Sequence, residues 1–147
     1  MSKYEEHIEG LLKKAIQEDA AAHASGYSSI KYAKEVTFPT LKRDGAPLRF
    51  DFALYKCDNL FCLIEVDGEH HFKQVKLFHS KTEFRHAKMN DRRKNKFCLV
   101  NGYPLYRVPF WDVYRLNSLT DILCGPAYLV TDKYHNDIII NLKKELK

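Results

Sequence analysis

The sequence predicts an α+β domain in which helices flank a mixed sheet. Apolar residues recur at helical spacing at the start of the chain and again over 82–101. Two strand-like apolar runs, over 48–55 and 61–66, lie between these helices, and a shorter run over 105–110 follows the second helix. Packing helices on the faces of one sheet is the usual way to bury such a mixture of elements.

The first elements along the chain are a helix and an extended segment. The helix is expected over 2–16, where the apolar residues share one face and Ser2 is placed to cap the N-terminus. The extended segment covers 30–38. A tight turn at Asp44-Gly45 then leads into the strand over 48–55, which pairs with the next strand as a hairpin.

The second half of the chain contains one long helix and several short elements. A loop over 68–80 precedes the long helix, which Gly102 is expected to end. The run over 105–110 predicts a short strand that Pro109 closes. Two further helices are expected over 117–123 and 137–146.

The composition is that of a globular protein, because 45% of the 147 residues are hydrophobic and 29% are charged. The formal net charge of +5 has the sign expected for a protein that binds a polyanion, although it carries weight only together with a site. The four cysteines form no CxxC pair, which favours reduced thiols over a zinc site. We find no signal-peptide pattern and no apolar stretch of membrane-spanning length, so we expect a cytoplasmic protein.

Carboxylates interrupt both central strands, where a strand would normally place another apolar residue. Asp51 lies in the first strand, and Glu65 and Asp67 lie in and after the second. Glu65 and Asp67 are two residues apart and therefore face the same side, and a hairpin would bring Asp51 to that side. Three neighbouring carboxylates repel one another unless a cation lies between them, and Mg²⁺ or Mn²⁺ suits such oxygen ligands best. The sequence therefore predicts a metal-dependent hydrolase site.

Four more residues are candidates for the same site. His71 follows the second strand and could be a general base, a metal ligand or a surface residue. Asp91 and Lys94 share a face of the long helix. Either they form a solvated salt bridge with each other, or Lys94 reaches the carboxylates and holds a phosphate or the attacking water there. Arg107, in an apolar strand, is either paired with a buried carboxylate or directed at a phosphate. Basic residues that could contact phosphates, or form no more than a solvated face, are Lys73, Lys88, Arg92, Arg93 and Lys96.

Several of these segments resemble the Vsr-like branch of the PD-(D/E)xK nuclease superfamily, which includes small phage and mobile-element endonucleases related to homing endonucleases and to the very-short-patch repair nuclease. The matching segments are Phe38-Pro-Thr-Leu, Leu48-Arg-Phe-Asp-Phe, Leu63-Ile-Glu-Val-Asp-Gly-Glu-His-His-Phe, Asn90-Asp-Arg-Arg-Lys-Asn-Lys-Phe-Cys, Asn101-Gly-Tyr and Leu105-Tyr-Arg-Val-Pro. The resemblance implies a restriction-endonuclease-like core of helix, three strands, helix and strand over about 4–111. We expect one nuclease domain over 1–147, in which residues 112–147 form a C-terminal helical extension.

The resemblance also assigns roles to acidic residues. Asp51 and Glu65 correspond to the metal-binding carboxylates of the family. Glu5 corresponds to the glutamate of the first helix, and Glu6 and Glu9 are close alternatives for that position.

Two further motifs of the family are matched in the second half of the core. Asp67 and His71 match the Asp-Gly-x-x-His run, and Asp91 and Lys94 match the Asp-x-x-Lys of the following helix. Asp67 stands where most of the superfamily has a strand lysine. The role of that lysine must then fall to Lys94 or to the histidine. The family histidine that often precedes the helix aspartate is Asn90 in this chain.

The function implied is that of a Mg²⁺-dependent endodeoxyribonuclease that hydrolyses DNA phosphodiester bonds, by nicking or by double-strand cleavage. His71 or Lys94 would orient or deprotonate the attacking water. Two other functions stay open, namely a non-catalytic DNA-binding module with a nuclease-like fold and an RNA-directed nuclease. We expect a double-strand cutter of this size to act as a homodimer, and a phage-encoded one to work in the host cytoplasm.

Overall fold

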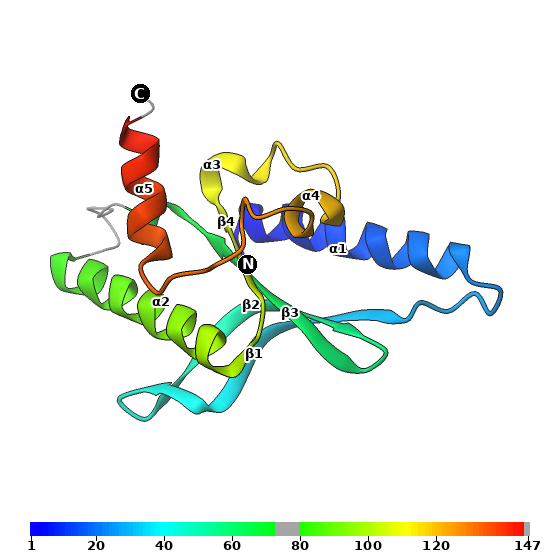
Figure 1. Cartoon of the computed structure of the whole chain (residues 1–147), viewed down its shortest axis with the longest axis horizontal. Coiled ribbons are helices and arrows are strands. Elements are labelled where there is room, and N and C mark those ends of the chain that lie inside the picture. Colours follow the sequence, from blue (N-terminus) through cyan, green and yellow to red (C-terminus); the bar gives the residue numbers. More distant parts are fainter. Residues whose placement is uncertain (73–79, 146–147) are drawn as a thin grey trace.

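The computed structural model describes residues 1–72 and 80–145, and the predicted phosphate contact Lys73 lies outside these ranges (Figure 1). In chain order the elements are α1 (Lys3–Ala22), β1 (Ile30–Arg43), β2 (Ala46–Lys56), β3 (Asn59–Asp67), η1 (Glu69–His71), α2 (Lys81–Asn101), β4 (Leu105–Pro109), α3 (Phe110–Val113), α4 (Leu119–Leu123) and α5 (His135–Glu145). Within the described ranges, none of the helices has the length and hydropathy that a bilayer span requires.

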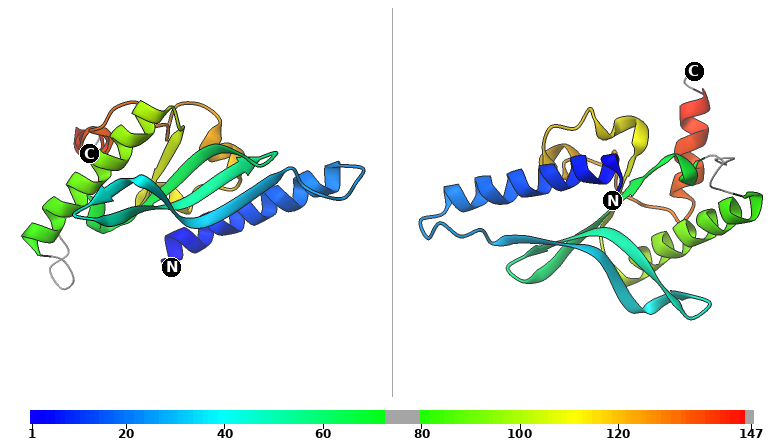
Figure 2. Two further views of the ribbon diagram at one scale, coloured as in Figure 1. Left: turned by 90° about the horizontal axis from the view of Figure 1, so that it is seen from below. Right: turned by 180° about the vertical axis from the view of Figure 1, so that it is seen from behind.

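The four strands form one mixed sheet in the order β1-β2-β3-β4. β1 pairs with β2, and β2 with β3, in antiparallel fashion, whereas β4 joins β3 in parallel. The connection from β3 to β4 contains α2, as a parallel pair requires. Helices lie on both sides of the sheet (Figure 2). The predicted α+β class, a mixed sheet flanked by helices, is confirmed.

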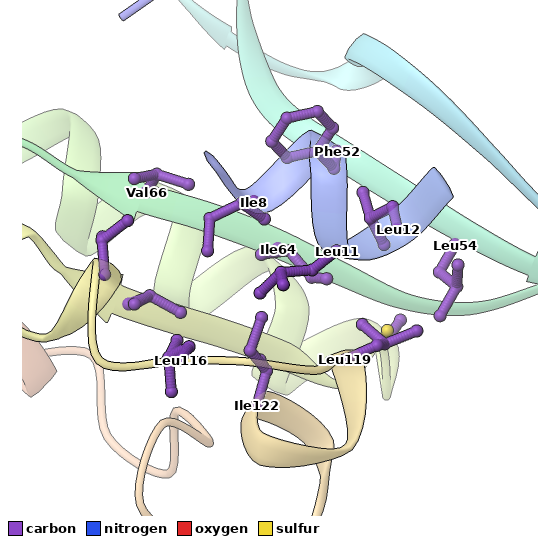
Figure 3. Packing of buried hydrophobic residues seen from close by; sticks show 13 residues of the cluster. Ile8, Leu11, Leu12, Phe52, Leu54, Ile64, Val66, Leu116, Leu119 and Ile122 are labelled. Carbon is purple, nitrogen blue, oxygen red and sulfur yellow. The ribbon is translucent and has the colours of Figure 1, made fainter. Parts of the chain in front are cut away.

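Side chains that alternate along β2 and β3 form two hydrophobic cores, one on each face of the sheet. On the first face, side chains of α1 point towards the strands, and side chains of the α3–α4 region complete the same core beside them (Figure 3). Labelled members of this core are Ile8, Leu11, Leu12, Phe52, Leu54, Ile64, Val66, Leu116, Leu119 and Ile122. On the second face, Phe97 and Cys98 of α2 pack over Phe50, Leu63 and Leu105. Burying each large apolar side chain contributes about 1.5–3 kcal/mol, which holds α1 and α2 against the sheet.

Several boundaries differ from the predicted ones. α1 continues to Ala22 rather than ending at residue 16, because residues 17–22 favour a helix although they lack an apolar period. β1 runs past residue 38 to Arg43, with a register shift between Thr37 and Lys42. This is possible because β1 is an edge strand, where a proline is tolerated. The short helix α3 was not predicted.

The helix α2 has the ends that its sequence indicates. Ser80 and Glu83 form a capping box, in which the Glu83 N–H donates to Ser80 Oγ at 3.1 Å and the Ser80 N–H donates to Glu83 Oε2 at 3.3 Å. Gly102 ends the helix in the left-handed region at φ 71°, a conformation that glycine adopts without strain. The buried face of α2 carries Asp91, Asn95 and Cys98.

Candidate active site

Asp51 and Glu65 lie side by side where β2 and β3 separate. The pleat of β2 is interrupted here, because Phe50 packs on the α2 side and Phe52 on the α1 side, although residues two apart on a regular strand share a face. In place of backbone pairing, the Asp51 N–H donates to Glu65 Oε1 at 2.7 Å, and the Val66 N–H donates to Asp51 Oδ2 at 2.7 Å. The structure thus brings these two predicted metal ligands together.

The charge around this pair is only partly balanced. Lys94 of α2 is 13% exposed, and its Nζ lies 3.1 Å from Glu65 Oε2, so α2 does bring its lysine to the carboxylates. Burial, together with the negative charges of Glu65 and Glu5, raises the pKa of Asp51 to about 8. Such a raised pKa marks a carboxylate whose negative charge is poorly compensated, and a bound cation would supply that compensation.

A cavity of about 230 Å³ opens beside Asp51. Its lining residues are Met1, Glu5, Lys34, Glu35, Asp51 and Phe52. Of the three glutamates considered for the first helix, Glu5 lines this cavity and Glu6 is exposed. The third, Glu9, is buried and accepts a hydrogen bond from the Tyr32 hydroxyl at 3.1 Å. Of the three glutamates, Glu5 is thus the one that lines the cavity together with Asp51.

Asp67 belongs to a second group of buried polar residues. Nη1 of Arg107 donates to Asp67 Oδ1 at 2.7 Å, and Nδ2 of Asn136 donates to Asp67 Oδ2 at 2.8 Å. Glu65 and Asp67 do face the same side of β3, since Nη1 of Arg107 also lies 3.9 Å from Glu65 Oε2. Both oxygens of Asp67 are nevertheless engaged by β4 and α5, so Asp67 groups with Arg107 and Asn136 rather than with Asp51.

Arg107 is 1% exposed, which does not favour the alternative that it is directed at a phosphate. The parallel pairing of β3 and β4 sets Arg107 beside Glu65, facing α2. Its Nε donates to Asn95 Oδ1 at 2.7 Å, and its Nη2 lies 3.5 Å from Asp91 Oδ1. An unpaired buried charge is strongly destabilising, so these partners are what allow a guanidinium at this position. The structure supports the other alternative, pairing with buried carboxylates.

His71 also joins this second group. Its Nδ1 lies 2.8 Å from Asp91 Oδ2 and 3.6 Å from Asp67 Oδ1. Burial by itself would lower the pKa of His71, but the charges of Asp67 and Asp91 outweigh burial and raise the pKa to about 9. The imidazole is therefore charged at neutral pH, and a charged imidazole has no lone pair with which to accept a proton.

Two groups of side chains offer ligand atoms for a metal ion. Atoms of Asp67, His71 and Asp91 all lie within 4.8 Å of one another. In that group a guanidinium and a charged imidazole already balance the two carboxylates. Asp51, by contrast, has no ion-pair partner within 4.0 Å among the residues that the structure describes. A divalent cation would therefore supply positive charge that Asp51 and Glu65 lack. The pair fits such an ion better than the group of Asp67, His71 and Asp91 does.

Four basic residues of α2 are predicted to contact phosphates, and the structure divides them into two pairs. Lys88 Nζ lies 3.4 Å from Asp137 Oδ1, and Arg92 Nη2 lies 3.2 Å from Asp137 Oδ2, so α5 engages both. Arg93 and Lys96 are exposed. Contact of these side chains with phosphate stays a prediction.

Some residues of the site escape recognition from the sequence. Asn95 lies four residues after Asp91, and this helical spacing is a signal that could have placed it on the same face. Asn136 carries no such signal, because it reaches Asp67 across a large separation in the chain. Lys34 and Glu35 likewise lie on β1, where no motif marks them as neighbours of the carboxylates.

The raised pKa of His71 has a consequence for stability that can be measured. Since the folded-state pKa of about 9 lies above the unfolded value of about 6.5, the stabilising contribution is complete below about pH 6.5 and is lost as the pH rises through about 9. We expect His71→Asn to flatten the pH dependence of the free energy of urea unfolding in this window, whereas His23→Asn, at an exposed site, should not. An NMR titration that places the folded-state pKa of His71 near 6.5 would contradict this expectation.

The chemistry-bearing part of the molecule thus consists of two hydrogen-bonded carboxylates, a lysine 3.1 Å from one of them and an adjoining cavity. Carboxylates of this kind bind hard divalent cations, and a fixed ammonium group can hold a water or a phosphate oxygen. Comparisons with models of known protein families, with curated proteins and with solved structures find no match for the chain.

Proposed function

We propose that the chain is a Mg²⁺-dependent endodeoxyribonuclease with a restriction-endonuclease-like core of the Vsr-like type. The observation that carries this proposal is the pair Asp51 and Glu65 beside a cavity, where the Asp51 N–H donates to Glu65 and the surrounding positive charge is too small to keep both carboxyl groups ionised. Lys94 lies at hydrogen-bonding distance from the same pair. Asp51 lines the cavity, and a pair of carboxylates with a lysine beside it is suited to metal-assisted hydrolysis of a phosphodiester.

Asp51 and Glu65 would hold the metal ion, because ionised carboxylates are the ligands that Mg²⁺ and Mn²⁺ prefer. When bound, the ion lowers the pKa of a coordinated water and neutralises charge on the phosphate. The chain fixes one oxygen of each carboxylate, through the Val66 N–H on Asp51 and through the Asp51 N–H on Glu65. Each carboxylate keeps lone pairs for a ligand, so these bonds orient the pair without saturating it.

Lys94 takes the role of the lysine that most of the superfamily carries on the strand, where this chain has Asp67. Its Nζ lies 3.1 Å from Glu65 Oε2 and 5.6 Å from the centre of the Phe50 ring, which fixes the direction of the ammonium group. The remaining N–H groups can hold the attacking water or a phosphate oxygen. The proposal gives His71 no role as the base, because its imidazole is charged at neutral pH.

DNA is the substrate class that the charge of the chain favours. The net charge is +5, and Arg93 and Lys96 are exposed on α2, the helix that also delivers Lys94. Contacts between such residues and phosphates release counterions, so binding to DNA should weaken steeply as the salt concentration rises.

The proposal is tested by incubating the protein in molar excess with supercoiled plasmid and with genomic DNA, in Mg²⁺, in Mn²⁺ and in EDTA. We expect nicked or linear products with either ion and intact DNA in EDTA. The ratio of nicked to linear plasmid also reports whether one strand or both are cut. A structured RNA is incubated in parallel under the same conditions.

Three outcomes would each replace the proposal with another function. Binding of DNA without cleavage in either ion indicates a non-catalytic DNA-binding module. Cleavage of RNA alone indicates an RNA-directed nuclease. A protein that neither binds nor cleaves nucleic acid has a different function altogether.

A further inference from the structure

The cavity beside Asp51 is lined by three acidic side chains and one basic one, among the residues that the structure describes. Glu5, Glu35 and Asp51 are the acidic ones, and Lys34 of β1 is the basic one. A DNA backbone that approaches this cavity carries negative charge and is repelled by carboxylates at short range. A cation on the protein, besides any metal ion, is therefore needed to hold the phosphates there.

Lys34 is held at the cavity by a buried glutamate. Its Nζ lies 3.1 Å from Oε2 of Glu9, which is 7% exposed and also accepts a hydrogen bond from the Tyr32 hydroxyl at 3.1 Å. The hydrogen bond from Lys34 lowers the pKa of Glu9, and Glu9 in turn raises the pKa of Lys34, so both groups are charged at neutral pH. Glu9 lies one helical turn from Glu5 on α1, which places the ammonium group close to the cavity wall.

The backbone of β1 is distorted at this point. Lys34 pairs with Phe52 and Val36 with Phe50, so that Glu35 lies opposite Asp51. Glu35 has φ 52°, a left-handed conformation that is strained for a residue with a side chain. Adjacent residues of a regular strand face opposite sides of the sheet, yet Lys34 and Glu35 both line the cavity. The distortion at Glu35 therefore accompanies the position of Lys34 at the cavity wall.

We propose that Lys34 binds a backbone phosphate of the DNA next to the Asp51–Glu65 pair, and that Glu9 is the residue that positions it. This inference rests on the proposed nuclease function and names a substrate contact for it. The Lys34 side chain is 49% exposed, so a phosphate can reach it. An ammonium group has three donors, and one bond to Glu9 leaves others for phosphate oxygens.

The matched comparison for Lys34→Ala is Lys31→Ala. Lys31 lies on the same strand and also contacts a carboxylate, Asp58, at 3.1 Å, but it pairs with Tyr55 and does not line the cavity. Both substitutions remove one positive charge. We expect Lys34→Ala to raise KM for duplex DNA about tenfold with kcat nearly unchanged, and to reduce the salt dependence of binding by about one phosphate contact. Lys31→Ala should change neither quantity, and Lys34→Arg should retain most of the affinity.

The positioning role of Glu9 is tested with a second matched pair on α1. Glu9→Gln removes the charge that holds the ammonium group and should raise KM in the same direction as Lys34→Ala. Glu6→Gln, at an exposed site of the same helix, makes the same change in net charge and should leave KM unaltered.

Separate results would overturn the inference and the proposed function. If the unaltered protein cleaves DNA and Lys34→Ala behaves like Lys31→Ala, the substrate contact is wrong while the nuclease function stands. If Lys34→Ala lowers kcat and leaves KM unchanged, Lys34 acts in the chemical step and not in binding. If the unaltered protein binds DNA without cleaving it, the nuclease function fails, and dissociation constants measured in EDTA still decide whether Lys34 contacts the DNA.

Discussion

Asp51→Asn should lower the rate of Mg²⁺-dependent DNA cleavage by about 10³-fold or more while the protein stays folded. The amide keeps the shape of the carboxylate but loses the charge that a divalent ion requires. The measurement is the single-turnover rate on plasmid DNA. Asp58→Asn makes the same change at an exposed turn residue and should leave the rate unaltered. Full activity of Asp51→Asn in Mg²⁺ would contradict the assignment of Asp51 as a metal ligand.

The same substitution should stabilise the metal-free protein at high pH. The pKa of Asp51 in the folded protein is about 8, above the unfolded value of about 3.9, so ionising this partly buried group destabilises the fold. Its destabilising effect is absent below about pH 4 and complete above about pH 8. In EDTA, Asp51→Asn should therefore have a higher melting temperature than the unaltered protein at about pH 8, with a much smaller difference at about pH 5.

The melting temperature also reports metal binding independently of activity. A ligand that binds only the folded state stabilises it, so Mg²⁺ should raise the melting temperature of the unaltered protein. Asp51→Asn should show little of this increase, whereas Asp58→Asn should show all of it. An equal increase in all three proteins would place the ion elsewhere, for example at Asp67, His71 and Asp91.

Arg107→Met should reduce the free energy of unfolding by about 3–5 kcal/mol. The guanidinium is fully buried and lies 2.7 Å from Asp67 and 3.5 Å from Asp91, so its removal leaves two buried carboxylates poorly compensated. The control is Arg115→Met, because Arg115 also contacts a carboxylate, Asp112 at 2.7 Å, but is 75% exposed. Its loss should amount to about 1 kcal/mol or less. Urea unfolding at neutral pH measures both values.

A double substitution separates the charge effect from the loss of packing. If uncompensated charge is the cause, adding Asp67→Asn to Arg107→Met should restore part of the lost stability, so that the two changes are not additive. Equal losses for Arg107→Met and Arg115→Met would show that the buried network contributes little. Strict additivity of the two substitutions would attribute the loss to packing instead of charge.

Features that depend on neighbours in the chain were predictable. Ser80 and Gly102 mark the ends of α2 because capping and the left-handed end conformation involve residues within one helical turn. The proximity of Asp51 and Glu65 follows from the register of a hairpin with a short turn, in which Phe52 pairs with Ile64. The end of β1 was misplaced, since Pro39 excludes a central strand but not an edge strand, and only the sheet order decides between them.

The α+β class, the ends of α2 and the proximity of Asp51 to Glu65 could be read from the sequence. The bonds of Asp67 to Arg107 and Asn136, and the place of Lys34 at the cavity, became known from the folded chain alone. The difference lies in the range of the interactions. Capping, turns and strand alternation act between residues that are close in the chain. A buried charge, in contrast, takes its partners from whichever elements pack around it, and those elements lie far apart in the sequence.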